Sequence, residues 1–396
     1  MSIPQSRNRL HIAYLTELDP FDRGNWSGGL YYVRRALQEY CGDVTCIGPL
    51  SSHEPSLLSR IWAKSSRTLF KKRYLQWINL AEARHCGLQA TQKLAEQAFD
   101  VIVAVGEAAI VYLETDIPIV LVGDATFAQL LDYHPYYTEL SSRSIHEIKV
   151  IERKTFKKVR AVIMSSEWAA RSAIQDYQVQ PEHVYVVPFG ANFDTVPGRE
   201  VADTRKPSGT CTLLFIAVEW ERKGGDIAYE ALLKLEEMGI KAELIVCGCM
   251  PPAGMTHPHM MVIPFLDKND ERQAREIEKL YATSDFLILP TQADCAPNVF
   301  REASAFGLPV ITSNTGGIAT IIRNEENGYM LPLSARGEDY ADLIADIYQD
   351  KLHYLRLVQS SRTAFEERLN WNVWGRHVHD ILVKECERSG LITMTM

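Results

Sequence analysis

Short runs of apolar residues alternate with longer amphipathic segments along almost the whole chain. Runs that are rich in Val, Ile and Leu and bounded by polar residues are typical of strands buried on both faces of a parallel sheet. We predict such strands at residues 10–15, 44–47, 101–105, 119–122, 161–164, 184–187, 212–218, 242–247, 260–265, 286–289 and 309–312.

Several segments between these runs place apolar residues three to four positions apart, which is helical spacing. The clearest predicted helices cover residues 29–40, 84–98, 226–238 and 270–283. Strands and helices that alternate in this way indicate a doubly wound α/β fold with parallel sheets.

The pattern breaks between residues 192 and 211, which form a polar stretch with Pro and Gly and no periodicity. Such a stretch is typical of a linker or a domain boundary, and 396 residues exceed the size of most single cores. We therefore predict two Rossmann-like domains, over residues 1–195 and 205–370, that face a central cleft. Open α/β sheets bind ligands at the carboxyl ends of their strands, so that cleft is the expected ligand site.

The composition, 46% hydrophobic and 23% charged, is that of an ordinary globular protein, and the net charge of -8 disfavours a nucleic-acid partner. The start of the sequence has too short an apolar run for a signal peptide, and no apolar stretch reaches the about 18 residues of a membrane span. The 8 cysteines are scattered, which predicts reduced thiols in the cytoplasm. Cys247 and Cys249 lack the spacing of a zinc site, so no metal is expected.

The most informative block reads LYATSDFLILPTQADCAPNVFREASAFGLPVITSNTGGI. A strand leads into a loop that ends at Asp294, and Pro297 suits the first turn of the next helix. The amides of Asn298 and Val299 have no partner inside that helix, so they and the positive end of its dipole favour phosphate or a sugar oxygen. Glu302 follows about one turn later and reaches the same site, where a carboxylate suits the hydroxyls of a ribose or a hexose.

A second block, LLFIAVEWERKGGDI, places Arg222 and Lys223 before a glycine pair that opens a helix. Two cations beside free helix amides form a clamp for a diphosphate; a surface pair at a helix start is the alternative. A third block, NWSGGLYYVRRAL, places Gly28 and Gly29 after the first strand, where backbone can approach a ligand closely. It lacks the third glycine and the acidic residue of a dinucleotide-binding fingerprint, which disfavours a dehydrogenase.

These blocks together resemble glycosyltransferase family 4, a retaining family with the GT-B fold. The family signature is an acidic residue, seven residues and then glutamate, and here it reads Asp294…Glu302. The resemblance implies that Glu302 holds the ribose hydroxyls of the nucleotide and that Asp294, in place of the usual glutamate, contacts the donor sugar. The C-terminal segment 371–390 is similar to the helix that crosses back onto the first domain in this family.

The resemblance implies further donor-site roles in the second domain. Arg222 and Lys223 would hold the diphosphate and stabilise its charge as it leaves. Phe265 and Leu266 lie where the backbone meets the base in the family, and Pro297 with the two amides after it completes the site.

In the first domain, the resemblance makes Gly28 and Gly29 the loop that closes over the donor phosphate and presents the acceptor. Asp124 lies in the stretch where many members have a histidine, so it is a candidate base on the acceptor side. His134 is the second candidate for that role, and a purely structural role for Asp124 is the alternative.

The implied reaction moves a hexose from a nucleoside diphosphate to an acceptor hydroxyl, with attack on the same face of the sugar. No cofactor is expected, and no Asp-x-Asp triplet occurs in the sequence, which fits a metal-free site. UDP-glucose or another UDP-hexose is the first choice of donor, and GDP-mannose is the next. The expected acceptor is a saccharide or lipid-linked saccharide in polysaccharide or glycolipid synthesis. A sugar-nucleotide epimerase of the same architecture and a non-catalytic nucleotide-sugar-binding protein are the two alternative functions.

One segment does not belong to these blocks. Residues 55–81 contain no acidic residue, but they contain six cations and two tryptophans. Cations attract anionic lipid headgroups and tryptophan favours the membrane interface, so peripheral membrane contact through this segment is one interpretation. Cations that border an acceptor groove, or that are merely solvated, are the other.

Overall fold

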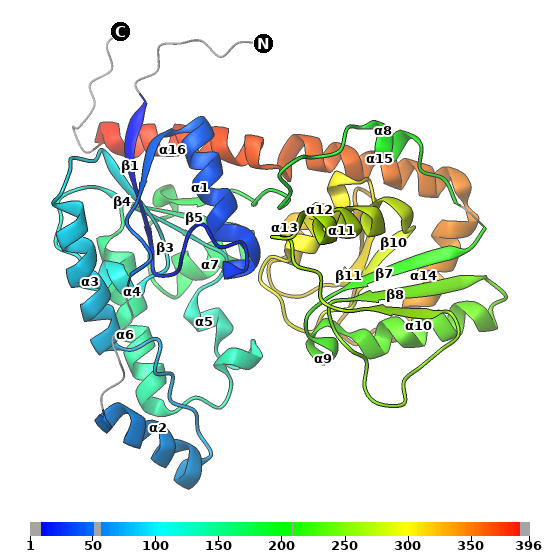
Figure 1. The fold of residues 1–396 in the computed structure, drawn as a ribbon, viewed down its shortest axis with the longest axis horizontal. Coiled ribbons are helices and arrows are strands. Elements are labelled where there is room, and N and C mark those ends of the chain that lie inside the picture. The colour runs from blue at the N-terminus through cyan, green and yellow to red at the C-terminus, as the bar shows by residue number, and fades with distance from the viewer. Residues whose placement is uncertain (1–8, 51–56, 208, 389–396) are drawn as a thin grey trace. The chain divides into compact units, whose positions relative to one another are not determined.

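The structure, a computed structural model, describes residues 9–50, 57–207 and 209–388. The chain separates into two units, one formed by Met1–Val187 with Trp374–Met396 and the other by Pro188–Val373. Each unit contains one six-stranded sheet with helices packed around it (Figure 1). The predicted α/β organisation with two Rossmann-like halves is confirmed.

The sheet of the N-terminal unit is parallel, with the strand order β2-β1-β3-β4-β5-β6. The strands of this sheet are β1 (Leu10–Thr16), β2 (Gly42–Cys46), β3 (Val101–Val105), β4 (Ile119–Gly123), β5 (Ala161–Met164) and β6 (Val184–Val186). The apolar side chains of β1, β3, β4 and β5 are buried on both faces, as near-continuous apolar runs predict. Each predicted strand of this half is present, with bounds shifted by at most two residues.

Helices of the N-terminal unit connect these strands. They are α1 (Gly29–Tyr40), α2 (Leu57–Phe70), α3 (Leu80–Leu94), α4 (Ala108–Val111), α5 (Phe127–Leu130), α6 (Ser142–Lys158) and α7 (Glu167–Gln175). The prediction of a helix at residues 84–98 was wrong in its bounds. Helix α3 begins at Leu80 because the side chain of Asn79 accepts hydrogen bonds from the amides of Ala81 and Glu82, at 2.9 and 3.0 Å.

The sheet of the C-terminal unit is also parallel, with the strand order β12-β11-β10-β7-β8-β9. Its strands are β7 (Cys211–Ile216), β8 (Ala242–Cys247), β9 (Met260–Ile263), β10 (Phe286–Leu289), β11 (Val310–Ser313) and β12 (Gly328–Leu331). Strand β9 ends two residues before the predicted end because Pro264 cannot donate to the ladder. Strand β12 was not predicted, since its four residues, GYML, form no apolar run.

The helices of this unit pack around its sheet. They are α8 (Glu200–Asp203), α9 (Trp220–Lys223), α10 (Gly225–Glu237), α11 (Glu271–Thr283), α12 (Asn298–Ala305), α13 (Ile318–Ile321), α14 (Gly337–Gln349) and α15 (Lys351–Arg368). Within the described ranges, no helix is both long enough and apolar enough to cross a membrane.

The last helix, α16 (Trp371–Arg388), returns the chain to the N-terminal unit (Figure 1). The Trp374 side chain is fully buried, and Gly375 packs so closely on the ring of Tyr40 that an added Cβ would lie 2.4 Å from it. Near the helix end, Tyr185 donates a hydrogen bond of 3.2 Å to Glu385. The predicted return of the C-terminal helix is confirmed.

The described part of residues 192–211, predicted as a linker or domain boundary, belongs to the C-terminal unit, which begins at Pro188. Phe193 and Ala202 are part of its hydrophobic core. Arg205 is 8% exposed, and its guanidinium donates to the carbonyl oxygens of Tyr281 at 2.7 Å and Phe306 at 3.3 Å, and to that of Ser284. The polar composition of this segment predicted a linker because it contains no apolar pattern. The segment packs nonetheless, because the buried guanidinium of Arg205 anchors it to three carbonyl oxygens.

The anchoring by Arg205 gives a stability prediction. Arg205→Met leaves three buried carbonyl oxygens without their donor, which costs about 3 kcal/mol of the unfolding free energy. Arg199 lies in the same segment as Arg205 and forms a partly exposed ion pair with Glu366 of α15. The control Arg199→Met removes this pair and should lower the unfolding free energy by less than about 1 kcal/mol. Urea unfolding of both variants measures the difference, and equal midpoints would contradict the anchoring role of Arg205.

Candidate functional site

The order of the strands in the C-terminal unit defines where its loops converge. Strand β7 comes first in the sequence of this unit and lies between β10 and β8. Connections therefore leave β7 and β10 in opposite directions, and open α/β sheets bind ligands at the carboxyl ends of the strands beside such a reversal. This place is called the crevice. The segment that follows β7 carries Arg222 and Lys223, in the short helix α9, and the loop that follows β10 carries Asp294.

The two loops are held together by a close backbone approach. Gly224, between α9 and α10, has φ of 77° and lies so near the Pro290 carbonyl that an added Cβ would be 2.1 Å from its oxygen. The amide of Gln292 donates to the carbonyl oxygen of Arg222 at 2.8 Å. A glycine is required here both by the left-handed backbone and by the contact. The glycine pair predicted to open a helix therefore sets the distance between the cations and the loop of Asp294.

Lys223 and Asp294 form an ion pair in this crevice. Their side chains are 13% and 12% exposed, so the alternative of a solvated surface pair does not describe Lys223. Arg222 Nη1 lies 3.9 Å from the same carboxylate oxygen and donates to the carbonyl of Ala293 at 3.0 Å. The structure thus brings together all three charged residues that the sequence assigned to the diphosphate and the donor sugar.

Arg222 has a second partner that sequence reasoning missed. Glu219 accepts from Arg222 Nε at 3.0 Å and from Nη2 at 2.8 Å, which is a bidentate pair. Burial alone would lower the pKa of Arg222, but the bonds to Glu219 and the charge of Asp294 raise it. Arg222 is therefore held by the carboxylates of Glu219 and Asp294. Lys223 is paired with Asp294, so replacement of this one partner would make its charge available to a ligand. The i,i+3 spacing of Glu219 and Arg222 was the signal in the sequence.

Helix α12 begins beside Asp294. Pro297 is the N-cap of this helix, with ψ of 124°, so its predicted place in the first turn was wrong by one position. Asn298 and Val299, both half-buried, are the first helical residues, and the first amides of a helix have no partner within it. The side chain of Asn298 accepts a hydrogen bond from Arg301, which fixes the first turn.

Glu302 lies on the buried side of α12. Its side chain is 1% exposed, with one oxygen paired to Lys268 Nζ at 2.5 Å and the other accepting from the Tyr281 hydroxyl at 2.8 Å. Both oxygens of Glu302 have protein partners, so a ligand that binds this carboxylate has to replace at least one of them. Lys268, whose side chain is 33% exposed, is the more accessible member of the pair. Its pairing with Glu302 could not be predicted because 34 positions separate the two residues.

The segment after β9 contains Phe265 and Leu266. Phe265 is 64% exposed, and Leu266 packs against the core of the unit. Lys268 follows directly and contacts Glu302, so this segment lies beside α12. An exposed aromatic ring such as that of Phe265 is suited to stack on a planar base.

Gly28 and Gly29 lie in the N-terminal unit, after β1. Trp26, Ser27 and Gly28 all have positive φ, and an added Cβ on Gly29 would lie 2.6 Å from the Trp26 ring. Backbone held in this way at three successive residues is uncommon and is often found where a ligand binds. The glycine pair is thus part of a tightly wound turn that begins α1.

The N-terminal sheet also reverses its strand order, between β1 and β3. Glu17 and Glu107 follow these two strands, and Asp124 follows β4. Burial and the charges of Glu152 and Glu17 raise the pKa of Glu107 to about 8, and Asp124 adds a smaller effect in the same direction. Burial raises the pKa of Glu152, on α6, to about 7. The sequence prediction found only Asp124 of this group, because the other acids show no motif.

His134, the second candidate for the base, caps a short turn. Its Nδ1 accepts from the amide of Tyr136 at 3.3 Å, and its ring stacks on that of Tyr136 at 5.3 Å. These local contacts explain the position of His134 within its own loop and give it a structural role.

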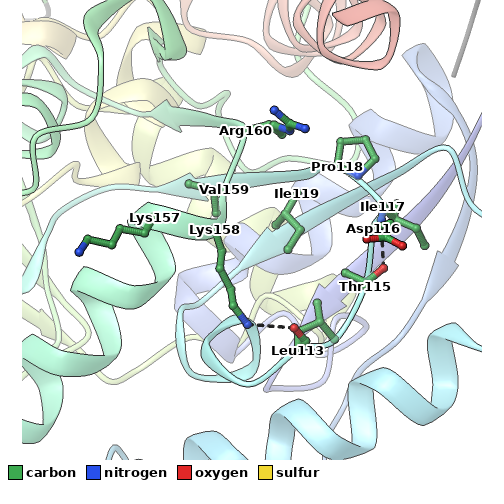
Figure 2. A pocket seen from close by; sticks show the side chains of 10 residues that line it. All are labelled: Leu113, Thr115, Asp116, Ile117, Pro118, Ile119, Lys157, Lys158, Val159 and Arg160. Carbon is green, nitrogen blue, oxygen red and sulfur yellow. Dashed lines mark hydrogen bonds between the residues drawn. The ribbon is translucent and has the colours of Figure 1, made fainter. Parts of the chain in front are cut away.

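A pocket of about 360 Å³ lies elsewhere in the N-terminal unit (Figure 2). Its lining comes from the residues before β4 and β5, so it opens at the amino ends of the strands, away from the crevice. Lys158 Nζ donates to the carbonyl of Leu113 at 2.9 Å, as Figure 2 shows, and to that of Ile110 at 3.3 Å. Burial lowers the pKa of Lys158. None of the predicted site residues lines this pocket.

Comparison with known proteins connects the crevice of the C-terminal unit to a family. The model of the family "Glycosyl transferases group 1" matches residues 210–350. The D-inositol 3-phosphate glycosyltransferase of Corynebacterium aurimucosum is 23% identical over 221 residues, which are 51% of this chain and 52% of that protein. The chain thus spans about half the length of this curated relative.

Two solved structures share the fold over nearly the full chain. Sucrose-phosphate synthase from Thermosynechococcus elongatus has a TM-score of 0.66 at 15% identity, and the match covers 94% of this chain and 98% of the synthase chain. The Anabaena protein Alr3699/HepE in complex with UDP-glucose has a TM-score of 0.63 at 13% identity and covers 94% of this chain and 100% of its own. At these identities the likeness establishes the fold.

The raised pKa values in the N-terminal crevice predict how stability depends on pH. The folded state keeps Glu107 protonated to higher pH than the unfolded state does, so stability present in mild acid is lost as the pH rises through about 8. Glu107→Gln removes this ionisation. Between about pH 6 and pH 9, the melting temperature of the variant should therefore fall less than that of the unmodified protein, and the two falls should differ by on the order of 5 °C.

Melting curves across this pH range measure the effect, with Glu96→Gln, an exposed acid, as the control. Parallel pH profiles for the unmodified protein and Glu107→Gln would show that Glu107 ionises normally in the folded state.

Proposed function

We propose, from the premise that this chain belongs to the family 4 glycosyltransferases and has the GT-B fold, that it moves a hexose from a nucleoside diphosphate sugar to an acceptor hydroxyl with retention of configuration. The observation that carries this proposal is the group formed by Lys223, Asp294 and Arg222 at the strand-order reversal of the C-terminal sheet. Two cations that share one sugar-binding carboxylate fit a ligand made of a diphosphate and a hexose.

An exchange of partners explains how this group would take up the donor. The diphosphate replaces Asp294 as the partner of Lys223, and the carboxylate so released accepts hydrogen bonds from hydroxyls of the hexose. Arg222 keeps Glu219 as its bidentate partner and directs its remaining charge at the phosphates. The charges of the site are thus balanced by protein groups before the donor binds and by the donor afterwards, so no buried charge is left unpaired.

The chemical step breaks the bond between the anomeric carbon and the diphosphate oxygen. The negative charge that develops on this oxygen is stabilised by Lys223, Arg222 and the first amides of α12. These groups supply the positive charge from the protein itself, so the proposed transfer needs no metal ion. Attack by the acceptor hydroxyl on the same face of the sugar needs no protein nucleophile, in contrast to the two-carboxylate retaining hydrolases.

UDP-glucose or a similar UDP-hexose is the proposed donor, and GDP-mannose is the alternative. A complex of Alr3699/HepE with UDP-glucose supports this choice. In this proposal Glu302 gives up Lys268 and binds the ribose hydroxyls, and the backbone at Phe265 and Leu266 meets the base. Lys268, once released, becomes a further cation for the nucleotide.

The proposed acceptor is a saccharide or a lipid-linked saccharide of polysaccharide or glycolipid synthesis in the cytoplasm. Gly28 and Gly29 follow β1 and Asp124 follows β4, with β3 between these two strands of the N-terminal sheet, and we assign acceptor binding to all three residues. Asp124 is the proposed base, and the neighbouring carboxyl of Glu107, largely protonated near neutral pH, can donate a hydrogen bond to the acceptor.

Contact with a membrane would bring such an acceptor to the enzyme. Helix α2 extends from the rest of the N-terminal unit (Figure 1). The described side chains of Arg60, Lys64 and Arg67 on this helix are exposed, and Ile61 is 59% exposed. Residues 55 and 56 and the side chains of Trp62 and Phe70 lie outside the described part of the chain. Trp77 is 58% exposed beside Tyr137, which supports an aromatic group at this surface.

The partner exchange predicts opposite effects of Asp294→Asn on binding and on transfer. The variant frees Lys223, so the affinity for UDP should rise about threefold to tenfold, because an internal competitor worth about 1 kcal/mol is lost. Hexose transfer should fall at least about tenfold, because the hydroxyl contacts of the donor sugar weaken.

Calorimetry with UDP and a transfer assay with UDP-glucose measure the two effects. Glu221→Gln, which neutralises an exposed acid beside Arg222, is the control and should change neither. A loss of UDP affinity in Asp294→Asn would contradict the exchange. A changed free sugar in place of a transferred one would indicate the epimerase, and UDP binding without either product would indicate the binding protein.

Vesicle binding tests the membrane contact. The triple variant Lys64→Gln, Lys71→Gln, Lys72→Gln should bind anionic vesicles about 100-fold more weakly, at about 1 kcal/mol per cation, with unchanged UDP affinity. The control Lys206→Gln, Lys241→Gln, Lys351→Gln removes three exposed cations from the C-terminal unit and should bind like the unmodified protein. If the unmodified protein does not cosediment with anionic vesicles at low salt, the contact does not exist.

A further inference from the structure

A cluster of two histidines and a glutamate lies on the C-terminal unit, apart from the site described above. Glu236 is in the last turn of α10, and His257 and His259 are in the segment that connects β8 to β9. One ligand atom from each residue lies within 4.8 Å of the other two. We propose that these three side chains bind a zinc ion or a similar transition-metal ion, which fastens this segment to α10.

The carboxylate of Glu236 faces both imidazole rings. Its Oε1 contacts His259 Nδ1, and its Oε2 lies 3.3 Å from His257 Nε2. The centroids of the two rings are 5.6 Å apart. Ligands of a tetrahedral zinc ion, with bonds of about 2.0–2.2 Å, lie roughly 3.3 Å from one another. The cluster therefore needs to contract by only about 1.5 Å at its widest separation to hold an ion.

The His257 ring is held in place from several sides. Its side chain is 18% exposed, the ring of Tyr229 packs against it edge-on with centroids 6.4 Å apart, and Pro258 restricts the backbone that follows. His257 Nδ1 accepts a 3.2 Å bond from the amide of His259. When Nε2 takes the ion, the ring carries its proton on Nδ1, so this local bond is exchanged for the metal bond. His259 is 61% exposed, so few packing contacts oppose the turn of its ring toward the ion.

The ligand set selects the class of ion. Imidazole nitrogens suit zinc, cobalt, nickel and copper, whereas magnesium and calcium prefer sites made of oxygens. A water molecule takes the fourth position of an ion that has three protein ligands. Thiols of the same unit compete weakly, since burial raises the pKa of both Cys247 and Cys249 to about 11 and the thiolate is the form that binds metal.

Because the cluster lies away from Lys223 and Asp294, we expect a bound ion to affect the stability of the fold and not the transfer of sugar. His259 directly precedes β9, and Glu236 ends the helix that leads to β8, so the cluster lies at the amino ends of these strands. Lys223 and Asp294 lie at the carboxyl ends of the same sheet. An ion that binds the folded cluster stabilises the fold by mass action without contacting the donor. This differs from the expectation, drawn from the sequence, that no metal site is present.

Thermal unfolding with zinc chloride tests the proposal on the full chain. Zinc should raise the melting temperature of the unmodified protein and of the control His146→Ala, His377→Ala, which removes two exposed histidines of the N-terminal unit. The rise should be lost in His257→Ala, His259→Ala. Glu236→Gln keeps both imidazoles and should bind zinc at least tenfold more weakly in a chelator competition.

Cobalt in place of zinc gives a spectroscopic readout of the same site. We expect one equivalent of cobalt with visible absorption and without the bands of a thiolate ligand, and UDP affinity that is unchanged by the metal. The proposal is overturned if zinc does not raise the melting temperature of the unmodified protein. It is also overturned if the rise persists in His257→Ala, His259→Ala, or if thiolate bands appear.

Discussion

The reversal of strand order beside the first strand of each sheet is the constraint on which the candidate sites depend. Strand β7 lies next to β10, and β1 lies next to β3, although each pair is far apart in sequence. Parallel strands end at the same edge, so the loops that follow them must meet there. In the C-terminal unit the approach of Gly224 to Pro290 fixes how closely they meet, and the pair of Lys223 and Asp294 follows from it.

Charge in the C-terminal crevice is balanced within the protein. Lys223 pairs with Asp294, Arg222 with Glu219, and Lys268 with Glu302. A cation in a partly buried site that lacks a partner loses hydration without compensation. The same residues that would bind a diphosphate and sugar hydroxyls therefore bind one another first. A ligand that carries both groups can replace these internal pairs, and this matching is the physical basis of the proposed specificity.

The N-terminal crevice follows the opposite principle. Burial raises the pKa of Glu17, Glu107 and Glu152, and the charges of Glu152 and Glu17 raise the pKa of Glu107 further. A carboxyl group kept neutral in this way can act as a hydrogen-bond donor near neutral pH. One unit thus presents balanced charges suited to a charged nucleotide, and the other presents uncharged acids suited to hydroxyls.

The sequence by itself determined the fold class, because apolar runs, glycines and capping residues act locally. The return of the C-terminal helix followed from the resemblance to the family. The sequence did not reveal the pairing of Lys223 with Asp294, or the protein partners of both oxygens of Glu302. It missed the anchoring by Arg205, which lies in a segment without an apolar pattern. Only the tertiary structure decided these points, because each depends on the distance between side chains brought together by separate loops, and no local pattern records that distance.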